Sequence, residues 1–217
     1  MLLEPDIRHA PIALWSIMQQ FLATLRSLFG DQQNIALQQV WTAKNYNLAL
    51  PWIRAGEAFL RHLLLIEAMH YSALAPAKPR ASRPRQRRLV TNDPNDPESW
   101  RVSFRCFPSN DDVGPAKNGV TLSSAPQAGA RPSKGEAGTE KRFFNAWPIA
   151  ERIEAMLRVF NNPGGYAKRL ARKLRAQPKL IRTLTKLPAN AHNLVGYDGF
   201  IQAEPLCDQA EKHFEPG

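Results

Sequence analysis

The sequence has few of the features that mark a secreted protein, a redox protein or a membrane protein. Its 217 residues include only two cysteines, Cys106 and Cys207, which are too far apart to form a metal-binding or redox motif. A reduced, cytoplasmic chain is therefore expected. Glu4 and Asp6 precede the first apolar run, which argues against a secretory signal peptide. No uncharged apolar run reaches the length of about 18 residues that a transmembrane helix needs, so none is expected.

Catalytic signatures are also missing. The chain has no G-x-x-x-x-G-K-[ST] phosphate loop, no G-x-G-x-x-G turn, no zinc-binding H-E-x-x-H and no G-x-S-x-G nucleophile elbow. Glu67 and His70 have the spacing of a metal-binding pair in a helical bundle, but no second pair accompanies them. We therefore expect no catalytic residue, no metal site and no cofactor. Because Glu67 falls among leucines on a helical wheel, it should pair with His62, His70 or another basic residue.

Basic residues outnumber acidic ones in the middle and the C-terminal part of the chain. The formal net charge is +10, which favours anionic partners but says nothing about the fold. Residues 1–75 contain five acidic and five basic residues, residues 76–140 contain seven and 11, and residues 141–217 contain seven and 13. Between positions 163 and 197 there are eight Lys and Arg and no Asp or Glu.

Residues 145–187 have the clearest helical periodicity, which predicts three short helices in succession. Asn145 is a good N-cap for the first helix, and Pro148 fits its first turn. Apolar residues spaced three and four apart then form one side, and acidic and basic residues form the other. The apolar side carries Ile149, Ile153, Met156, Leu157 and Phe160, and the polar side carries Glu151, Glu154 and Arg158. Asn162-Pro163 and Gln177-Pro178 each end one helix and begin the next.

The second and third of these helices are apolar on one side and basic on the other. The apolar side carries Tyr166, Ala167, Leu170, Ala171, Leu174, Leu180, Ile181, Leu184 and Leu187. The basic side carries Lys168, Arg169, Arg172, Lys173, Arg175, Lys179, Arg182 and Lys186. Such a surface attracts polyanions by neutralising phosphates and releasing counterions. Three interpretations are open: a solvated face without a partner, a contact with nucleic-acid backbone, and a contact with an acidic protein or lipid surface.

The N-terminal part predicts two amphipathic helices and one long apolar helix. The first spans residues 11–29 and ends at Gly30, after which Asp31 should cap a short helix that continues through Trp41. Residues 45–47, Asn-Tyr-Asn, indicate a turn or an interrupted helix. The third helix, over residues 50–73 with Pro51 at its start, is apolar around most of its circumference and should be the central helix. Alternatively, Leu60 and Leu64 on this helix bind a partner or a second copy of the chain.

Residues 76–140 are rich in Pro, Gly, Ser and Arg and predict a flexible basic linker. Its basic run includes Arg83, Arg85, Arg87 and Arg88, which either contact phosphates or only keep the linker soluble. An island at 100–107 alternates apolar and polar residues, as a half-buried strand does. Through Trp100 and Phe104 it should dock on the helices as an extended segment or, alternatively, pair with a partner's sheet.

Taken together, the patterns predict an all-α fold, a small helical bundle interrupted by a long, largely disordered crossover. The helical segments are 1–75 and 141–188, and about 70 N-terminal residues expose too much apolar surface to fold alone, so we expect one bundle. The tail, 189–217, should contain a short acidic helix at Glu204–Phe214 that could lie against the basic side. The expected function is non-enzymatic interaction with nucleic-acid backbone or another polyanion; the alternative is a protein–protein adaptor or self-associating module.

Overall fold

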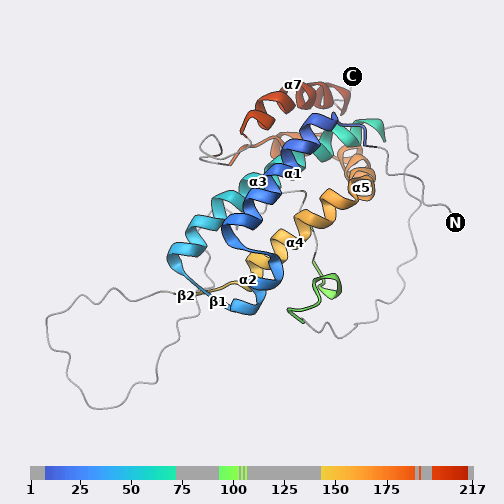
Figure 1. The fold of residues 1–217 in the computed structure, drawn as a ribbon. Coiled ribbons are helices and arrows are strands. Elements are labelled where there is room, and N and C mark those ends of the chain that lie inside the picture. Colours follow the sequence, from blue (N-terminus) through green and yellow to red (C-terminus); the bar gives the residue numbers. More distant parts are fainter. Residues whose placement is uncertain are drawn as a thin grey trace, which may run out of the picture.

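Helix α3, Ala43–His70, runs through the middle of the molecule and is covered by other helices on most of its circumference (Figure 1). The computed structural model describes residues 8–71, 93–102, 104, 106, 143–188, 191 and 197–214. Most of the predicted linker at 76–140 therefore lies outside the described residues. Nearly every side chain of α3 between Ala55 and Ala68 is buried, as its apolar circumference predicts.

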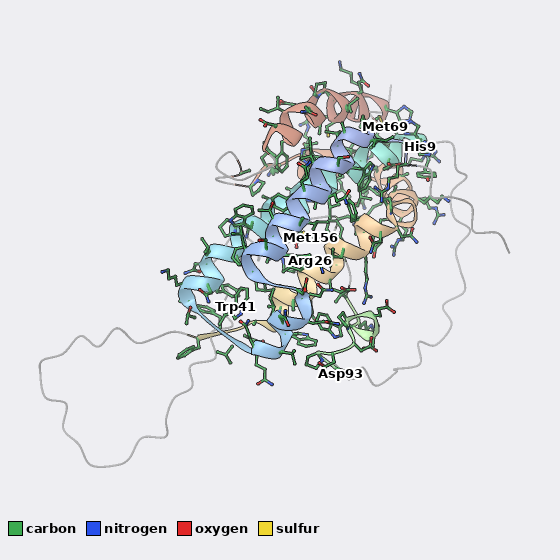
Figure 2. The ribbon with its side chains drawn as sticks, in the orientation of Figure 1. His9, Arg26, Trp41, Met69, Asp93 and Met156 are labelled. Carbon is green, nitrogen blue, oxygen red and sulfur yellow. The ribbon has the colours of Figure 1, made fainter. Side chains whose placement is uncertain are left out.

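Four helices surround α3. They are α1 (Ile12–Phe29), α4 (Trp147–Asn161), α5 (Pro163–Ala176) and α7 (Tyr197–Phe214). Apolar side chains from all of them belong to one continuous core, and Met156 lies in its interior (Figure 2). The predicted all-α bundle is confirmed, and its N-terminal and C-terminal helical segments pack together rather than separately.

Helix α3 begins earlier than the sequence suggests. The Thr42 hydroxyl accepts a hydrogen bond from the Asn45 N–H at 3.4 Å and caps the helix, so the turn predicted at residues 45–47 is wrong. Pro51 lies inside the helix and removes only one backbone hydrogen bond. Burial of Tyr46, whose ring stacks on Phe144 with centroids 4.7 Å apart, favours the helical conformation of this first part.

Helix α2 is shorter than predicted and is followed by a strand. It spans Gln32–Gln38, and Gln39 ends it with a positive φ of 54°. Strand β1 (Val40–Thr42) then pairs antiparallel with β2 (Phe143–Asn145), with Trp41 opposite Phe144. The pairing joins segments about a hundred residues apart, which a local pattern does not reveal. Asp31 does not cap α2 with its side chain, because that carboxylate binds Arg26 at 2.6 Å.

Glu67 is buried among leucines, as predicted, but its partners differ from those expected. Its carboxylate accepts hydrogen bonds from the backbone N–H groups of His9 and Ala10, at 2.9 and 3.0 Å. The indole N–H of Trp15 donates to the same carboxylate at 3.3 Å. The predicted pairing with a basic side chain is therefore wrong. The backbone donors just before α1 compensate the buried charge and fix where α1 begins.

The stop-and-start arrangement predicted for the C-terminal helices is present. The N-cap of α4 is Ala146 rather than the predicted Asn145, whose side chain instead accepts a hydrogen bond from the Trp147 N–H at 2.9 Å. Past Gln177 the chain forms a 3-10 turn, η3 (Pro178–Leu180), and a single α-helical turn, α6 (Ile181–Leu184). Because α6 ends at Leu184, Leu187 is 47% exposed instead of joining the apolar side. Glu154, predicted on the polar side of α4, is buried because α2 packs over it.

Helix α7 is longer than predicted, because it begins at Tyr197 rather than Glu204. Its first turn contains Gly199, and a Cβ there would lie 2.6 Å from Phe59 Cζ of α3. The glycine therefore allows close helix packing and does not mark a turn. The neighbouring Phe200 packs on the rings of Phe59 and His62, with centroids 5.2 and 5.5 Å apart. Burial under α7 lowers the pKa of His62.

The described part of the island at 100–107 docks on the helices. The 3-10 turn η1 (Pro97–Ser99) precedes it, and Trp100 packs against Trp147 of α4 with centroids 4.7 Å apart. Trp100 is 2% exposed and Phe104 9% exposed, so both belong to the core. Within the described ranges, no helix is long and apolar enough to cross a membrane.

Candidate nucleic-acid interface

Helix α5 contributes one side to the core and the other to the surface. Ala167, Leu170, Ala171 and Leu174 are buried, and α5 makes its main packing contact with α3. Pro163 at the first turn and Gln177 at the end set the limits of the helix. The amphipathic pattern therefore fixes the rotation of α5 about its own axis and turns the basic residues outward.

All eight predicted basic residues of α5, η3 and α6 have exposed side chains. We call this set the basic face: Lys168, Arg169, Arg172, Lys173, Arg175, Lys179, Arg182 and Lys186. No acidic residue lies between Pro163 and Pro188 to neutralise it. They lie on the consecutive elements α5, η3 and α6, with Lys186 just past the end of α6.

Contacts with aromatic rings hold part of the basic face in place. The Arg169 guanidinium lies 4.5 Å from the centroid of the Tyr166 ring, and its Nε donates to the Gly165 carbonyl at 3.2 Å. The Lys168 ammonium lies 5.1 Å from the centroid of the Tyr71 ring. Such cation–π contacts leave the charge accessible while reducing the number of side-chain conformations.

An acidic residue of helix α7 contacts the basic face. The Glu211 carboxylate lies 3.7 Å from Arg182 Nε. Since Arg182 is 81% exposed in this pair, the contact is weak. The predicted contact between the acidic tail and the basic side is therefore present at Arg182, while α7 packs mainly on α3 and α1.

A pocket of about 320 Å³ opens beside the basic face, between α5 and the docked residues Val102, Phe104 and Cys106. We call it the Phe104 pocket. Helix α5 contributes Tyr166, Arg169, Leu170 and Lys173. The rings of Phe104 and Tyr166 meet edge to face, with centroids 6.5 Å apart. The pocket therefore has aromatic and aliphatic walls and two cations at its rim.

The electrostatics of the Phe104 pocket can be judged from Cys106. Burial raises the pKa of its thiol, and the positive charges of Arg169, Arg61 and Lys173 oppose that rise. Three cations thus act on one point of the pocket wall, but the net rise of the thiol pKa shows that burial outweighs them there.

The remaining predicted binding residues are placed differently. Arg83, Arg85, Arg87 and Arg88 lie outside the described residues. Leu60 and Leu64, predicted as partner-binding, are 0% exposed in the core, so the adaptor hypothesis in that form is wrong. The apolar circumference of α3 is covered by the chain's own helices and needs no second protein. Trp100 is likewise buried. Phe104 is 9% exposed and forms one wall of the Phe104 pocket.

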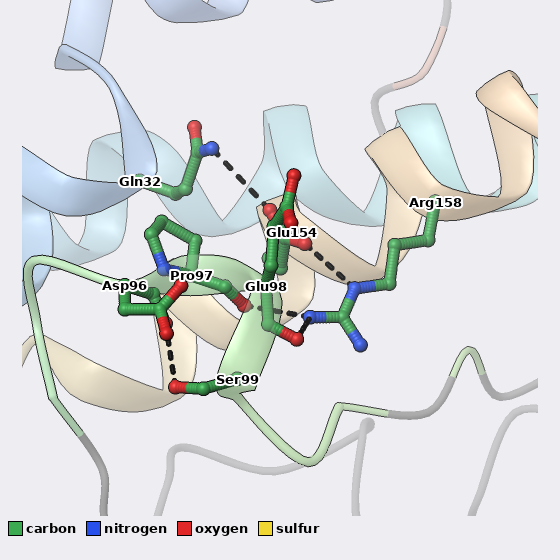
Figure 3. Close-up of polar contacts among 7 residues, drawn as sticks. All are labelled: Gln32, Asp96, Pro97, Glu98, Ser99, Glu154 and Arg158. Atoms are coloured by element: carbon green, nitrogen blue, oxygen red, sulfur yellow. Dashed lines mark hydrogen bonds and ion pairs between the residues drawn. The ribbon is translucent and has the colours of Figure 1, made fainter.

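A second, more polar pocket of about 550 Å³ lies between α1, α2, α4 and η1. Beside it, Arg158 donates to the Glu154 carboxylate at 2.6 Å and to the Pro97 carbonyl at 2.6 Å (Figure 3). Gln32 donates to the other carboxylate oxygen at 3.3 Å. These contacts tie η1 and α2 to α4. They leave the carboxylate paired, so we assign this cluster to structure; sequence reasoning missed it because its members are distant in the chain.

Across the part of the chain that the structure describes, no three His, Cys, Asp or Glu side chains gather as metal ligands would. The ring of His70 from the predicted Glu67/His70 pair stacks on His9 with centroids 4.3 Å apart. Comparison with protein-family models, with curated proteins and with solved structures finds nothing that matches this chain.

Proposed function

We propose that this chain is a non-enzymatic helical interaction protein that binds a polyanion, the phosphate backbone of a nucleic acid, through the basic face. The observation that carries the proposal is the exposure of all eight basic side chains on a surface without a carboxylate of its own. Each phosphate contact releases condensed counterions, which makes such a surface favourable for a regularly charged polymer. Contacts of this kind position a ligand but do not read its sequence.

The arrangement along α5 supports an elongated ligand. Lys168, Arg172 and Arg175 recur at intervals of four and three residues, so they line up along one side of the helix. At 1.5 Å per residue this row extends over about 10 Å. Because α5 is fixed by its buried side, the row is already ordered before a ligand binds, and less entropy is lost on binding. These features favour a backbone contact over a merely solvated face.

The test compares two double charge reversals. Arg172→Glu with Lys179→Glu changes the basic face, whereas Lys44→Glu with Lys212→Glu changes exposed residues elsewhere and alters the net charge equally. Affinity for a labelled oligonucleotide is measured by fluorescence anisotropy between about 50 and 200 mM salt. We expect the wild-type affinity to fall steeply as the salt concentration rises. The first variant should bind more weakly, and the slope of its log affinity against log salt concentration should be smaller by about two, one for each lost phosphate contact.

The control double variant should retain the wild-type slope. Equal loss in both double variants would mean that only the net charge matters, and the basic face would lose its assignment. Absence of salt-dependent binding in the wild-type protein would reject the proposed function altogether. Circular dichroism of both variants checks that the helices are intact, since exposed substitutions change stability by only about 0.5 kcal/mol.

A further inference from the structure

The Phe104 pocket is not explained by a contact with phosphates alone. A polyanion without apolar groups would need only the exposed cations, and would leave the apolar walls at Val102 and Tyr166 in contact with water. The pocket nevertheless adjoins the basic face and shares Arg169 and Lys173 with it. Its walls and its rim therefore favour a ligand that is flat and apolar in one part and anionic in another.

The walls are suited to a planar ring. Tyr166 is half-buried, so one part of its ring is held by the protein while another remains accessible. Phe104 meets it edge to face with an interplanar angle of 90° and keeps it in position. Arg169, which lies over the Tyr166 ring, can offer its own guanidinium plane for stacking. Sequence-tolerant stacking of bases uses surfaces of this kind, because every base has a π-face.

The rim is suited to the charges on either side of such a ring. Arg169 and Lys173 are four residues apart, about 6 Å along the helix axis, and both project from α5 at the pocket. A strand whose base enters the pocket would bring its flanking phosphates to these two side chains. The positive charge of Arg61, which also acts on Cys106, adds to the attraction for these phosphates.

We infer that the Phe104 pocket takes one unstacked base of a single-stranded nucleic acid, with Arg169 and Lys173 on the adjoining phosphates. This inference rests on the proposed function and narrows it from polyanions to single strands. A duplex keeps its bases stacked and paired, so it cannot offer one to the pocket without the free energy of flipping it out. An acidic peptide that carries aromatic residues is a different class of ligand and is distinguished by the experiment below.

The experiment uses the full chain and probes of equal charge, with a duplex half as long as the single strands. They are a single-stranded DNA, the same sequence as RNA, an oligonucleotide of abasic sugar-phosphate units, the DNA duplex, and an acidic peptide containing tyrosine. The base-bearing single strands should bind more tightly than the abasic strand. Because stacking contributes about 1–3 kcal/mol per base, Tyr166→Leu should weaken the base-bearing strands about 5- to 100-fold and leave the abasic strand unchanged. Phe143→Leu, an exposed ring at β2, is the matched control and should change neither.

Equal affinity for base-bearing and abasic strands would overturn the inference while the proposed function stood. Preference for the duplex or for the acidic peptide would also overturn it. Failure of every nucleic-acid probe to bind would reject the proposed function itself. Should Tyr166→Leu not fold, ultraviolet cross-linking of the unaltered protein to a thymine-bearing strand decides instead. A cross-link on Phe104, Cys106 or Tyr166 supports the inference, and one confined to other residues overturns it.

Discussion

Helices α3 and α5 pack against each other, yet they have opposite relations to solvent. Between Ala55 and Ala68, α3 is buried around nearly its whole circumference, whereas α5 buries one stripe and exposes the rest. The core therefore constrains almost every side chain in this part of α3 but only six of the 14 residues of α5. The positions that the core leaves free on α5 are the ones that carry the positive charge. Surface function is available on α5 because α3 supplies so much of the core.

The charged residues of the two helices also differ in their surroundings. Glu57 of α3 forms a bidentate ion pair with Arg152 of α4, both bonds at 2.7 Å, and Glu67 is held by backbone donors. The two acidic residues of α3 thus have partners built into the fold. The cations of α5 have no carboxylate on their own helix, and Arg182 of α6 pairs with Glu211 of α7. Charge around α3 therefore joins elements of the fold, whereas α5 presents its cations on its exposed side.

The largest expected effect comes from truncating a core residue of α3. Leu64→Ala removes a side chain that is 0% exposed and leaves a cavity, so we expect a loss of about 2–5 kcal/mol in the free energy of unfolding. Leu48→Ala, in the same helix but 58% exposed, should cost no more than about 0.5 kcal/mol. Urea denaturation followed by circular dichroism measures both. Equal losses would contradict the assignment of α3 as the central buried helix.

A smaller effect, of opposite sign in the two helices, is expected from glycine substitution. In α3 a Cβ on Gly56 would lie 2.7 Å from Phe21 Cε1 and 3.0 Å from Met156 Sδ, so Gly56→Ala should destabilise by about 1–3 kcal/mol. In α5 a Cβ on Gly165 would meet only Asn162 Oδ1, at 3.8 Å. Gly165→Ala should therefore stabilise by about 0.4–1 kcal/mol, since alanine restricts the unfolded chain and favours helix.

Thermal unfolding of the two alanine variants measures this contrast directly. A stabilising Gly56→Ala would mean that α1 and α4 approach α3 less closely than the structure shows. A destabilising Gly165→Ala would mean that the start of α5 is packed as tightly as the middle of α3. Either result would remove the difference between the two helices.

The difference between α3 and α5 could be predicted from the sequence because helical periodicity decides it. The apolar circumference of α3 predicts burial, and the spacing of the eight cations of α5 and its continuation predicts that they share one side. Proline pairs also predicted where α5 begins and ends. All of these signals are local, and each depends on residues no more than a few turns apart.

The features that the sequence did not reveal depend on contacts between distant segments. Strand β1 forms only because β2 pairs with it, and α7 begins at Tyr197 because Gly199 fits against Phe59. The Phe104 pocket likewise needs the segment 102–106 to lie against Tyr166. Alternation at Trp100, Val102, Phe104 and Cys106 predicted that one side of this segment would be buried, but not which helix would bury it. Distance in the chain, rather than weak patterning, limited the prediction.

The smallest expected effect is a pH dependence of stability. It comes from a histidine of α3, a residue type that is absent from the basic face of α5. His62 is buried under α7, its Nδ1 lies 2.8 Å from the Ala58 carbonyl oxygen, and burial lowers the pKa of its imidazole below the ordinary 6.5 despite the nearby Glu204. The neighbouring positive charge of Arg61 acts in the same direction as burial. Below pH 6.5 the unfolded chain therefore binds more protons at His62 than the folded chain. Stability from this group is present above pH 6.5 and is lost as the pH falls through that value.

Between pH 7 and pH 6 this loss is less than about 1 kcal/mol for one histidine. It is measured as the difference between wild type and His62→Gln, in which the other titrating groups are retained and cancel. As the pH falls across this interval, the wild type should lose stability relative to the His62→Gln variant. The basic face contains no histidine, so the relative effect of Arg172→Glu with Lys179→Glu on oligonucleotide affinity should stay constant over the same interval. The opposite result would be a relative oligonucleotide affinity that changes with pH and a difference in unfolding free energy between wild type and His62→Gln that does not. It would mean that the titrating group belongs to the surface rather than to the contact between α3 and α7.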